Sequence, residues 1–258
     1  MIYINGSPAD MARIARARPV RGIESICLSR MMRGAGAYYY ASIGELHFEL
    51  ALRRTTVARA ERLRLAGLNF ESFRGSYCNK RYWIRTANGG FELRRGVSPA
   101  AAVRDIYSNG REYGTECATA MQIVYCGALL DLVTDSAFDT HFGGMRLMNW
   151  HDIPTPLKET GSLHRVKDYL PGDRRYFSNP EVNLNAPEWQ GENVIDMGDG
   201  TYYGHGIGRR RADKIIATLN SARRASARRS AYLIPTAGRP DYSRLYSMFG
   251  SALRPAPR

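Results

Sequence analysis

The segment from Thr115 to Val133 limits the choice of fold more than any other part of the chain. A helix here would be apolar around its whole circumference rather than along one stripe, so it must be buried on all sides. The longest apolar run in the chain, Ile123 to Val133, contains Asp131 and is shorter than the roughly 20 residues that span a membrane. The pattern therefore predicts the central helix of a globular domain.

The order of the remaining elements favours an α+β fold with a mainly antiparallel sheet. Helical periodicity with an apolar stripe that includes Leu65 covers residues 43–65, and Ser98-Pro99 supplies a helix N-cap followed by proline at the first helical position. Asn88-Gly89 is a strong signal for a β-hairpin. Most of the strands come later, at 145–150, 174–179, 190–208 (a hairpin) and 230–235, with a helix at 212–223. Helices followed by strands are typical of α+β domains.

Composition divides the chain into three parts. We expect residues 1–38 to form a basic, partly ordered leader, residues 39–235 one compact domain, and residues 236–258 a peripheral tail rich in proline and arginine. The N-terminus has no apolar core before its charges, so no secretory signal is expected. The four cysteines form no CxxC pair, which argues against a zinc ribbon and against a disulfide scaffold.

The chain is strongly basic, and arginine accounts for the excess. Lys and Arg number 37 against 24 acidic residues, a net charge of +13, but there are only four lysines and two glutamines. A GC-rich genome, which favours arginine codons, is one explanation. Residues 13–33 and 209–229 carry net charges of +5 and +7 and can bind an anionic surface. Without zinc-finger spacing or an RNA-binding strand motif, nucleic acid is only an alternative partner.

Cys117 lies in the first turn of the central helix, directly after Thr115-Glu116. Unpaired backbone N–H groups and the positive end of the helix dipole favour the thiolate there, which is the nucleophilic form. The same N–H groups can stabilise an oxyanion on an attacked carbonyl. A cysteine in an apolar helix can also be an ordinary core residue, so this position alone leaves both interpretations open.

The hairpin at 190–208 offers a carboxylate and an imidazole as partners. If the hairpin closes over two or four residues around Gly198-Asp199, Glu192 lies opposite His205; if it closes over Asp199-Gly200, the two lie diagonally on the same face. A three-residue turn without a bulge would put them on opposite faces. Gly204 and Gly206 leave room beside His205 for another group to approach closely. An ordinary surface pair across two strands is the alternative.

A cysteine at a helix start followed by a histidine on a strand is the arrangement of papain-like cysteine enzymes. The segments RDIYSNGREYGTECATAMQIVYCGALLDL and RRYFSNPEVNLNAPEWQGENVIDMGDGTYYGHGIG resemble the spore-coat protein-glutamine gamma-glutamyltransferase of Bacillus-type bacteria, a small calcium-independent transglutaminase. SIGELHFELALRR, NFESFRGSYCNKRYW and MNWHD extend the resemblance to about residues 38–235. ECATA, NPE, W-x-GEN and the histidine that follows fall in register.

The resemblance implies a single-domain fold related to NlpC-type cysteine peptidases, with Cys117 as the nucleophile. It implies Glu192 and His205 as its partners, and Glu116 as a carboxylate that assists the thiol. Four aromatic residues match those that line the substrate tunnel of the family: Phe70, Trp150, Tyr176 and Trp189. No metal or other cofactor is implied, and the acidic turn at Asp196–Gly200 lacks the pattern of an EF-hand loop.

The function implied is the joining of a protein glutamine to a protein lysine through a cysteine thioester, either in the cytoplasm or on an assembled spore or cell-surface layer. An enzyme of this kind benefits from offering few lysines and glutamines of its own, which is a second explanation for the composition. Two alternatives remain: an NlpC-type peptidase or amidase that uses water as the acceptor, and a non-enzymatic basic module that binds nucleic acid.

Overall fold

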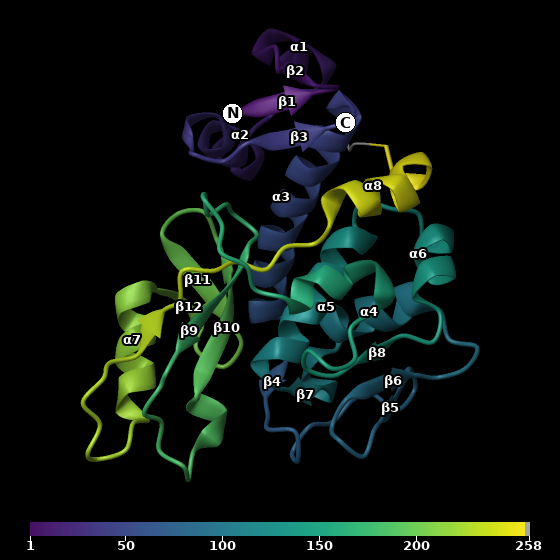
Figure 1. Ribbon diagram of the computed structural model, residues 1–258. Coiled ribbons are helices and arrows are strands. Elements are labelled where there is room, and N and C mark those ends of the chain that lie inside the picture. The colour runs from purple at the N-terminus through teal and green to yellow at the C-terminus, as the bar shows by residue number, and fades with distance from the viewer. Residues whose placement is uncertain (256–258) are drawn as a thin grey trace.

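The computed structural model describes residues 1–255, and α5 (Cys117–Leu130) is its central helix (Figure 1). Every residue from Ala118 to Leu130 is buried, which confirms the expectation of a helix enclosed on all sides. The long helix α3 (Ile43–Leu65) packs along it and begins at Ser42, whose hydroxyl accepts a hydrogen bond from the Glu45 N–H at 3.1 Å. No helix in the described part of the chain combines the length and apolarity needed for a membrane span.

The single apolar stripe expected on α3 does not account for all of the buried residues of that helix. Leu65 is exposed, whereas Arg53 and Arg59 are buried. The cause is that α3 is covered from several directions, by α5, by α2 (Ile23–Arg33) and by α8 (Tyr242–Phe249). Both arginines are therefore enclosed, and each has an acidic partner: Arg53 pairs with Glu49 and Asp173, and Arg59 pairs with Asp131 at the end of α5.

A five-stranded antiparallel sheet lies beside the helices, in the order β12-β11-β10-β9-β13 (Figure 1). Its strands are β9 (Arg174–Ser178), β10 (Gly191–Asp196), β11 (Thr201–Gly204), β12 (Gly208–Arg211) and β13 (Tyr232–Leu233). Ile195 and Tyr203 face the core shared with α5. Val194 and Phe177 face the opposite side, where α7 (Ala212–Ser221) covers the sheet. The α+β architecture follows the order of elements read from the sequence.

Smaller elements complete the body of the molecule. The Asn88-Gly89 turn joins β5 (Trp83–Arg85) to β6 (Phe91–Leu93) as expected, with Gly89 at a φ of +93°. The helix after Ser98 also forms, and the Ser98 hydroxyl accepts from the Ala101 N–H at 3.2 Å. The remaining elements are β4 (Asn69–Phe70), α4 (Pro99–Ser108), β7 (Gly114–Thr115), α6 (Asp135–Phe142), β8 (Arg146–Leu147) and four short 3-10 turns at Gly110–Glu112, Thr155–Gly161, Pro187–Trp189 and Gly250–Ala252.

The first 38 residues are folded, which corrects the expectation of a partly ordered leader. They form β1 (Ile2–Ile4), β2 (Ser7–Pro8), α1 (Met11–Ala17) and α2, and β1 pairs in parallel with β3 (Tyr38–Tyr40). Their apolar side chains make a small core against α3, built from Ile2, Ile14, Cys27, Leu28, Met31, Tyr40, Leu46 and Leu50, with Leu170. The arginines of this segment lie outside that core, so the basic composition concealed an ordered unit.

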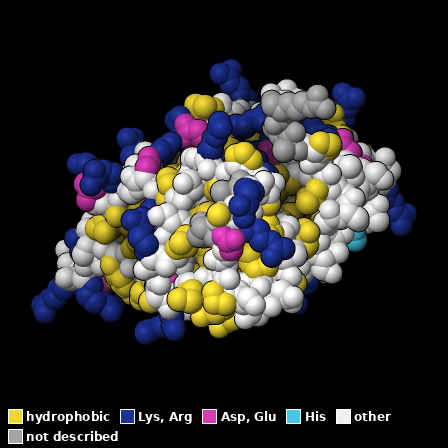
Figure 2. Space-filling model, turned by 90° about the horizontal axis from the view of Figure 1, so that it is seen from above, with side chains coloured by type: hydrophobic (Ala, Val, Ile, Leu, Met, Phe, Trp, Pro, Cys, Tyr) yellow, Lys and Arg dark blue, Asp and Glu magenta, His cyan; other side chains and the backbone are white. Residues whose placement is uncertain are grey.

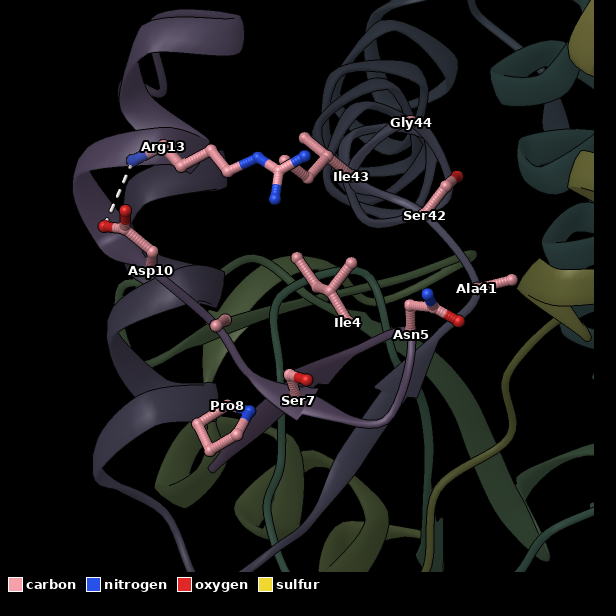
Figure 3. A pocket seen from close by; sticks show the side chains of 11 residues that line it. Ile4, Asn5, Ser7, Pro8, Asp10, Arg13, Ala41, Ser42, Ile43 and Gly44 are labelled. Atoms are coloured by element: carbon pink, nitrogen blue, oxygen red, sulfur yellow. Dashed lines mark hydrogen bonds between the residues drawn. The ribbon is translucent and has the colours of Figure 1, made fainter.

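A cavity of about 560 Å³ lies between this unit and the start of α3. Arg13 extends across it from α1 towards Ile43 (Figure 3). On the face seen in Figure 2, Lys and Arg side chains stand around much of the outline and are not gathered into one patch.

The segment after residue 235 is part of the core, which corrects the expectation of a peripheral tail. Leu245 and Phe249 of α8 are fully buried in the main core.

Arg239 donates to both oxygens of the buried Asp173, at 2.6 and 2.7 Å. Asp173 also accepts from Arg53 at 2.9 Å, and Arg53 pairs with Glu49 at 2.8 Å. This network ties α3, the loop before β9 and the C-terminal segment together. Residues 256–258 lie outside the described part of the chain.

We expect Arg239→Met to lower the free energy of unfolding by about 3 kcal/mol, because it removes two charge-assisted hydrogen bonds and leaves Asp173 short of positive charge. Denaturant unfolding measures the change. Arg64→Met is the matched control: it breaks an exposed pair with Glu61, and such pairs contribute about 0.5 kcal/mol or less. Equal losses in the two variants would contradict this account of the network.

Candidate active site

Cys117 is the first residue of α5, and Glu116 is the N-cap of that helix. The Glu116 carboxylate accepts hydrogen bonds from the N–H groups of Ala118 at 2.5 Å and Thr119 at 2.8 Å. Two donors of the first turn are therefore already occupied. The N–H of Cys117 itself has no hydrogen-bond partner within residues 1–255, so it is the first-turn donor left for an oxyanion.

The surroundings of Cys117 disfavour the thiolate that its position at a helix start suggested. Burial raises the pKa of Cys117 well above its usual range, and the nearby Glu192 and Glu116 raise it further. The helix N-terminus cannot offset these effects, since its N–H groups point to the Glu116 carboxylate. Attack on a carbonyl therefore needs a base that removes the thiol proton.

Glu192 on β10 lies close enough to Cys117 for its charge to raise the pKa of the thiol. Its side chain is buried, and Oε1 has no hydrogen-bond partner in the described residues. Burial, and then the charge of Glu116, raise the pKa of Glu192 well above its ordinary value. The carboxyl group packs on the bare α-carbon of Gly204, where an added Cβ would lie 2.5 Å from Oε1. Gly204 thus makes the close approach that its sequence position suggested, and the group that it admits is Glu192.

The register of the β10–β11 hairpin differs from the expected ones. Val194 pairs with Gly204 and Ile195 with Tyr203, so the turn contains the three residues from Gly198 to Gly200. Both of these glycines have positive φ, 88° and 85°, which lets a turn of this length close. Glu192 therefore does not lie opposite His205. The expectation that both share one face of the paired strands is wrong, because a turn one residue longer or shorter reverses the facing of one strand.

His205 lies just past the last paired residue of β11 and is buried. Its Nε2 is 3.0 Å from the Asn69 carbonyl oxygen, and its Nδ1 is 3.5 Å from the Tyr203 hydroxyl. A carbonyl only accepts, so Nε2 carries the proton. Burial lowers the pKa of His205 to about 4, so the imidazole is neutral near pH 7. Within the described residues no hydrogen bond joins it to Cys117 or Glu192.

Asn193 is a site residue that the sequence analysis missed. Its Nδ2 donates to the Cys117 sulfur at 3.4 Å, and its Oδ1 accepts from Nη1 of Arg174 at 2.8 Å. It stands between Glu192 and the buried Val194, and alternation along β10 puts it on the same face as Ile195. That alternation is the signal that could have identified it.

The four aromatic residues divide into two groups around the site. The Phe70 ring lies 6.0 Å from the Trp189 ring and 5.9 Å from the His205 ring. Phe70 packs where a Cβ on Gly206 would be, 2.7 Å from the ring, so this glycine admits an aromatic neighbour.

The second aromatic group contains Tyr176 and Trp150. Tyr176 is the partner of Asn193 across the β9–β10 ladder, and its pKa is raised to about 12 by burial and by Cys117 and Glu192. One face of Trp150 is covered by the Arg174 guanidinium, 4.1 Å from the ring centre. That face is therefore already occupied by a cation.

Comparison with known proteins was made on the sequence and on the fold. Residues 1–249 match the family described as protein-glutamine gamma-glutamyltransferase. Proteins of that name from Bacillus cereus (strain B4264) and Bacillus anthracis (strain CDC 684 / NRRL 3495) are 41% and 42% identical over 231 residues, which are 88% of this chain and 81% of each relative. The structure of a transglutaminase from Geobacillus stearothermophilus, without its C-terminal extension, superposes with a TM-score of 0.74 at 40% identity, covering 80% of this chain and 97% of that one.

We expect iodoacetamide to label Cys117 first in the folded protein. The side chains of Cys27, Cys78 and Cys126 are buried, whereas Cys117 is partly exposed, so the reagent can reach Cys117 without local unfolding. Peptide mass spectrometry after one equivalent of reagent should show the label on Cys117, and Cys117→Ala should abolish it. Cys126→Ala should leave it unchanged, since that thiol lies in the main core. Faster labelling of Cys126 would exclude Cys117 as the reactive thiol.

Proposed function

The chain belongs to the protein-glutamine gamma-glutamyltransferase family and transfers the γ-glutamyl group of a protein glutamine to an amine; from this premise we propose that Cys117 is the nucleophile. The observation that carries the proposal is a partly exposed cysteine at the start of a buried helix, with Glu116 and Glu192 close enough to raise its pKa. The substrates are proteins with accessible glutamine and lysine side chains, and the product is an ε-(γ-glutamyl)lysine isopeptide bond.

The first half of the reaction forms a thioester. Glu192, as carboxylate, takes the proton from the Cys117 thiol while the sulfur attacks the side-chain carboxamide of the bound glutamine. The Cys117 N–H stabilises the oxyanion that develops. Glu192 then returns the proton to the departing nitrogen, the carbon–nitrogen bond breaks, and ammonia leaves. The raised pKa of Glu192 suits this exchange, because a carboxylate with a raised pKa takes up a proton more readily than an ordinary glutamate does.

The second half transfers the acyl group to lysine. A neutral ε-amine attacks the thioester carbonyl, Glu192 accepts a proton from the amine nitrogen, and the carbon–sulfur bond breaks. The proton passes to the sulfur, so the thiol is restored and one ammonia has been exchanged for one lysine. His205, neutral and hydrogen-bonded to the Asn69 carbonyl, orients the end of β11 in this scheme and carries no charge.

The aromatic side chains limit access of water to the thioester, which a transferase needs because water competes with the amine. Phe70 and Trp189 form one wall of the approach, on the His205 side. Trp150 and Tyr176 form the other, beside Arg174 and Asn193. Because the Arg174 guanidinium covers one Trp150 face, only the remaining face can attract a lysine ammonium.

The proposal extends to the fold and to the composition. A cysteine at a buried helix start, packed against an antiparallel sheet, supports kinship with NlpC-type and papain-like cysteine enzymes.

Of the two glutamines, Gln122 is buried and donates to the Asn149 carbonyl, whereas Gln190 is exposed. A chain with one exposed glutamine and four lysines offers its own chemistry few targets.

Incubation with a glutamine-bearing protein and a labelled primary amine in the presence of EGTA tests the function. We expect incorporation of the amine and release of ammonia, and complete loss of both in Cys117→Ala with no change in the far-UV circular dichroism spectrum. Cys126→Ala is the matched control and should retain activity. Ammonia release without incorporation would identify a hydrolase instead, and binding of DNA with unchanged affinity in Cys117→Ala would favour the basic module.

The pH dependence should reveal the two carboxyl groups. Because Glu192 must be ionised to act as base and its pKa is raised, the acidic limb of kcat/KM should lie above the ordinary glutamate range. Glu116→Gln removes a negative charge that raises the pKa of Glu192, so the limb should move to lower pH. Asp199→Asn, in the exposed hairpin turn, should leave the limb in place. An acidic limb that Glu116→Gln does not move would remove Glu116 from the electrostatics of the base.

A further inference from the structure

Arg174, at the start of β9, is a buried cation without an acidic partner. Its side chain is 2% exposed, and it donates from Nε to the Thr160 carbonyl at 2.9 Å and from Nη2 to the Gly161 carbonyl at 3.1 Å. The remaining donor, Nη1, is bonded to Asn193 Oδ1 at 2.8 Å. Within residues 1–255 no carboxylate lies within 4.0 Å of this guanidinium. Burial lowers the pKa of Arg174 to about 10.

Arg53 shows how a buried arginine is neutralised by carboxylates, whereas Arg174, like its neighbour Arg175, has only carbonyl, amide or aromatic partners among the described residues. Arg53 is equally enclosed, but it is neutralised by Glu49 at 2.8 Å and Asp173 at 2.9 Å. A buried charge without a counter-ion costs several kcal/mol, so buried arginines are normally paired in this way. At Arg174 the space is also fitted to the guanidinium. Trp150 covers one face, and a Cβ on Gly238 would lie 2.9 Å from Nε. The cation is therefore held close to the site with no resident anion.

The contact with Arg174 fixes which way the Asn193 amide points. A guanidinium only donates, so the amide oxygen must face Arg174 and the amide nitrogen must face the Cys117 sulfur. A donor bound to the oxygen also polarises the amide and makes its N–H a stronger donor. The sulfur consequently receives a hydrogen bond whose direction and strength both depend on Arg174.

We propose that Arg174 is a positioning residue that acts through Asn193: it holds the Asn193 amide towards Cys117 and supplies the positive charge that stabilises the thiolate during attack. The charged and titratable groups facing Cys117 are Glu116 at the helix start, Glu192 on β10, and Tyr176 and Arg174 on β9. The carboxylates oppose ionisation of the sulfur, and Arg174 is the one cation in this group. The Cys117 thiolate that forms during attack then serves as the counter-ion of Arg174.

The pH profile of Cys117 alkylation by iodoacetamide tests the inference. The inference builds on the assignment of Cys117 in the proposed function, but alkylation needs no glutamyl transfer, so the two can fail separately. Arg174→Met should shift the profile to higher pH and slow alkylation about tenfold at pH 7, which corresponds to a change of one pKa unit. Arg174→Lys, which keeps the charge, should recover part of that loss. Cys117 is identified as the labelled residue by mass spectrometry in each case.

Arg175→Met is the matched control. Arg175 is the next residue on β9, is also buried, stacks on Tyr169 at 3.6 Å, and donates to the Thr236 and Ile234 carbonyls at 2.8 and 3.3 Å. It lies on the opposite face of β9, so its loss should reduce thermal stability without moving the alkylation profile. A shift of equal size in both arginine variants would overturn the inference, as would an unmoved profile in Arg174→Met.

A second variant covers the case in which Arg174→Met does not fold. Asn193→Ala should shift the profile in the same direction, and Arg174→Lys in the Asn193→Ala background should add little, since the path from arginine to sulfur is already broken. An unmoved profile in Asn193→Ala would overturn the inference. Normal amine incorporation together with unmoved profiles would reject the role of Arg174 while leaving the proposed function standing.

Discussion

The burial of α5 determines where the chemistry takes place. Since the helix is apolar on all sides, it is enclosed by α3, the sheet and the smaller helices. Its first turn packs against β10. Cys117 thereby contacts Asn193 on β10, although some 75 residues of chain lie between them, and Glu192 on the same strand is near enough to raise its pKa. The same packing raises the pKa of the partly exposed thiol, so the arrangement that assembles the site also makes a base necessary.

Features set by local sequence could be predicted, and features set by pairing between distant segments could not. The central helix, the Ser98 cap and the Asn88-Gly89 hairpin depend on residues close together in sequence, and they formed as expected. The β10–β11 register depends on whether the turn holds two, three or four residues. The sequence Gly198-Asp199-Gly200 is compatible with each of these turn lengths, so it does not determine the register. The parallel pairing of β1 with β3 spans two helices, so composition alone suggested a loose leader.

The electrostatics of the site show a similar limit. A cysteine at a helix start suggests a stabilised thiolate, but here the preceding Glu116 caps the helix and takes two of its N–H groups. The local rule therefore left out the two carboxyl groups that raise the pKa of Cys117. In the proposed role, the positive charge of Arg174 on β9 offsets the effect of the two carboxyl groups on the pKa of Cys117. The burial of Arg174 and its distance from any carboxylate could not be predicted from the sequence, because arginine is abundant throughout the chain.

The inclusion of Arg239 and α8 in the core bears on when the chain matures during synthesis. Asp173 directly precedes Arg174 on the chain, and its second arginine partner follows 66 residues later. A nascent chain whose Arg239 and α8 are still inside the ribosome holds the cysteine and both carboxyl groups, but it lacks the ion pair that fixes the start of β9. Domains fold as units, so the capacity to cross-link other proteins arises only after the segment with Arg239 and α8 has left the ribosome.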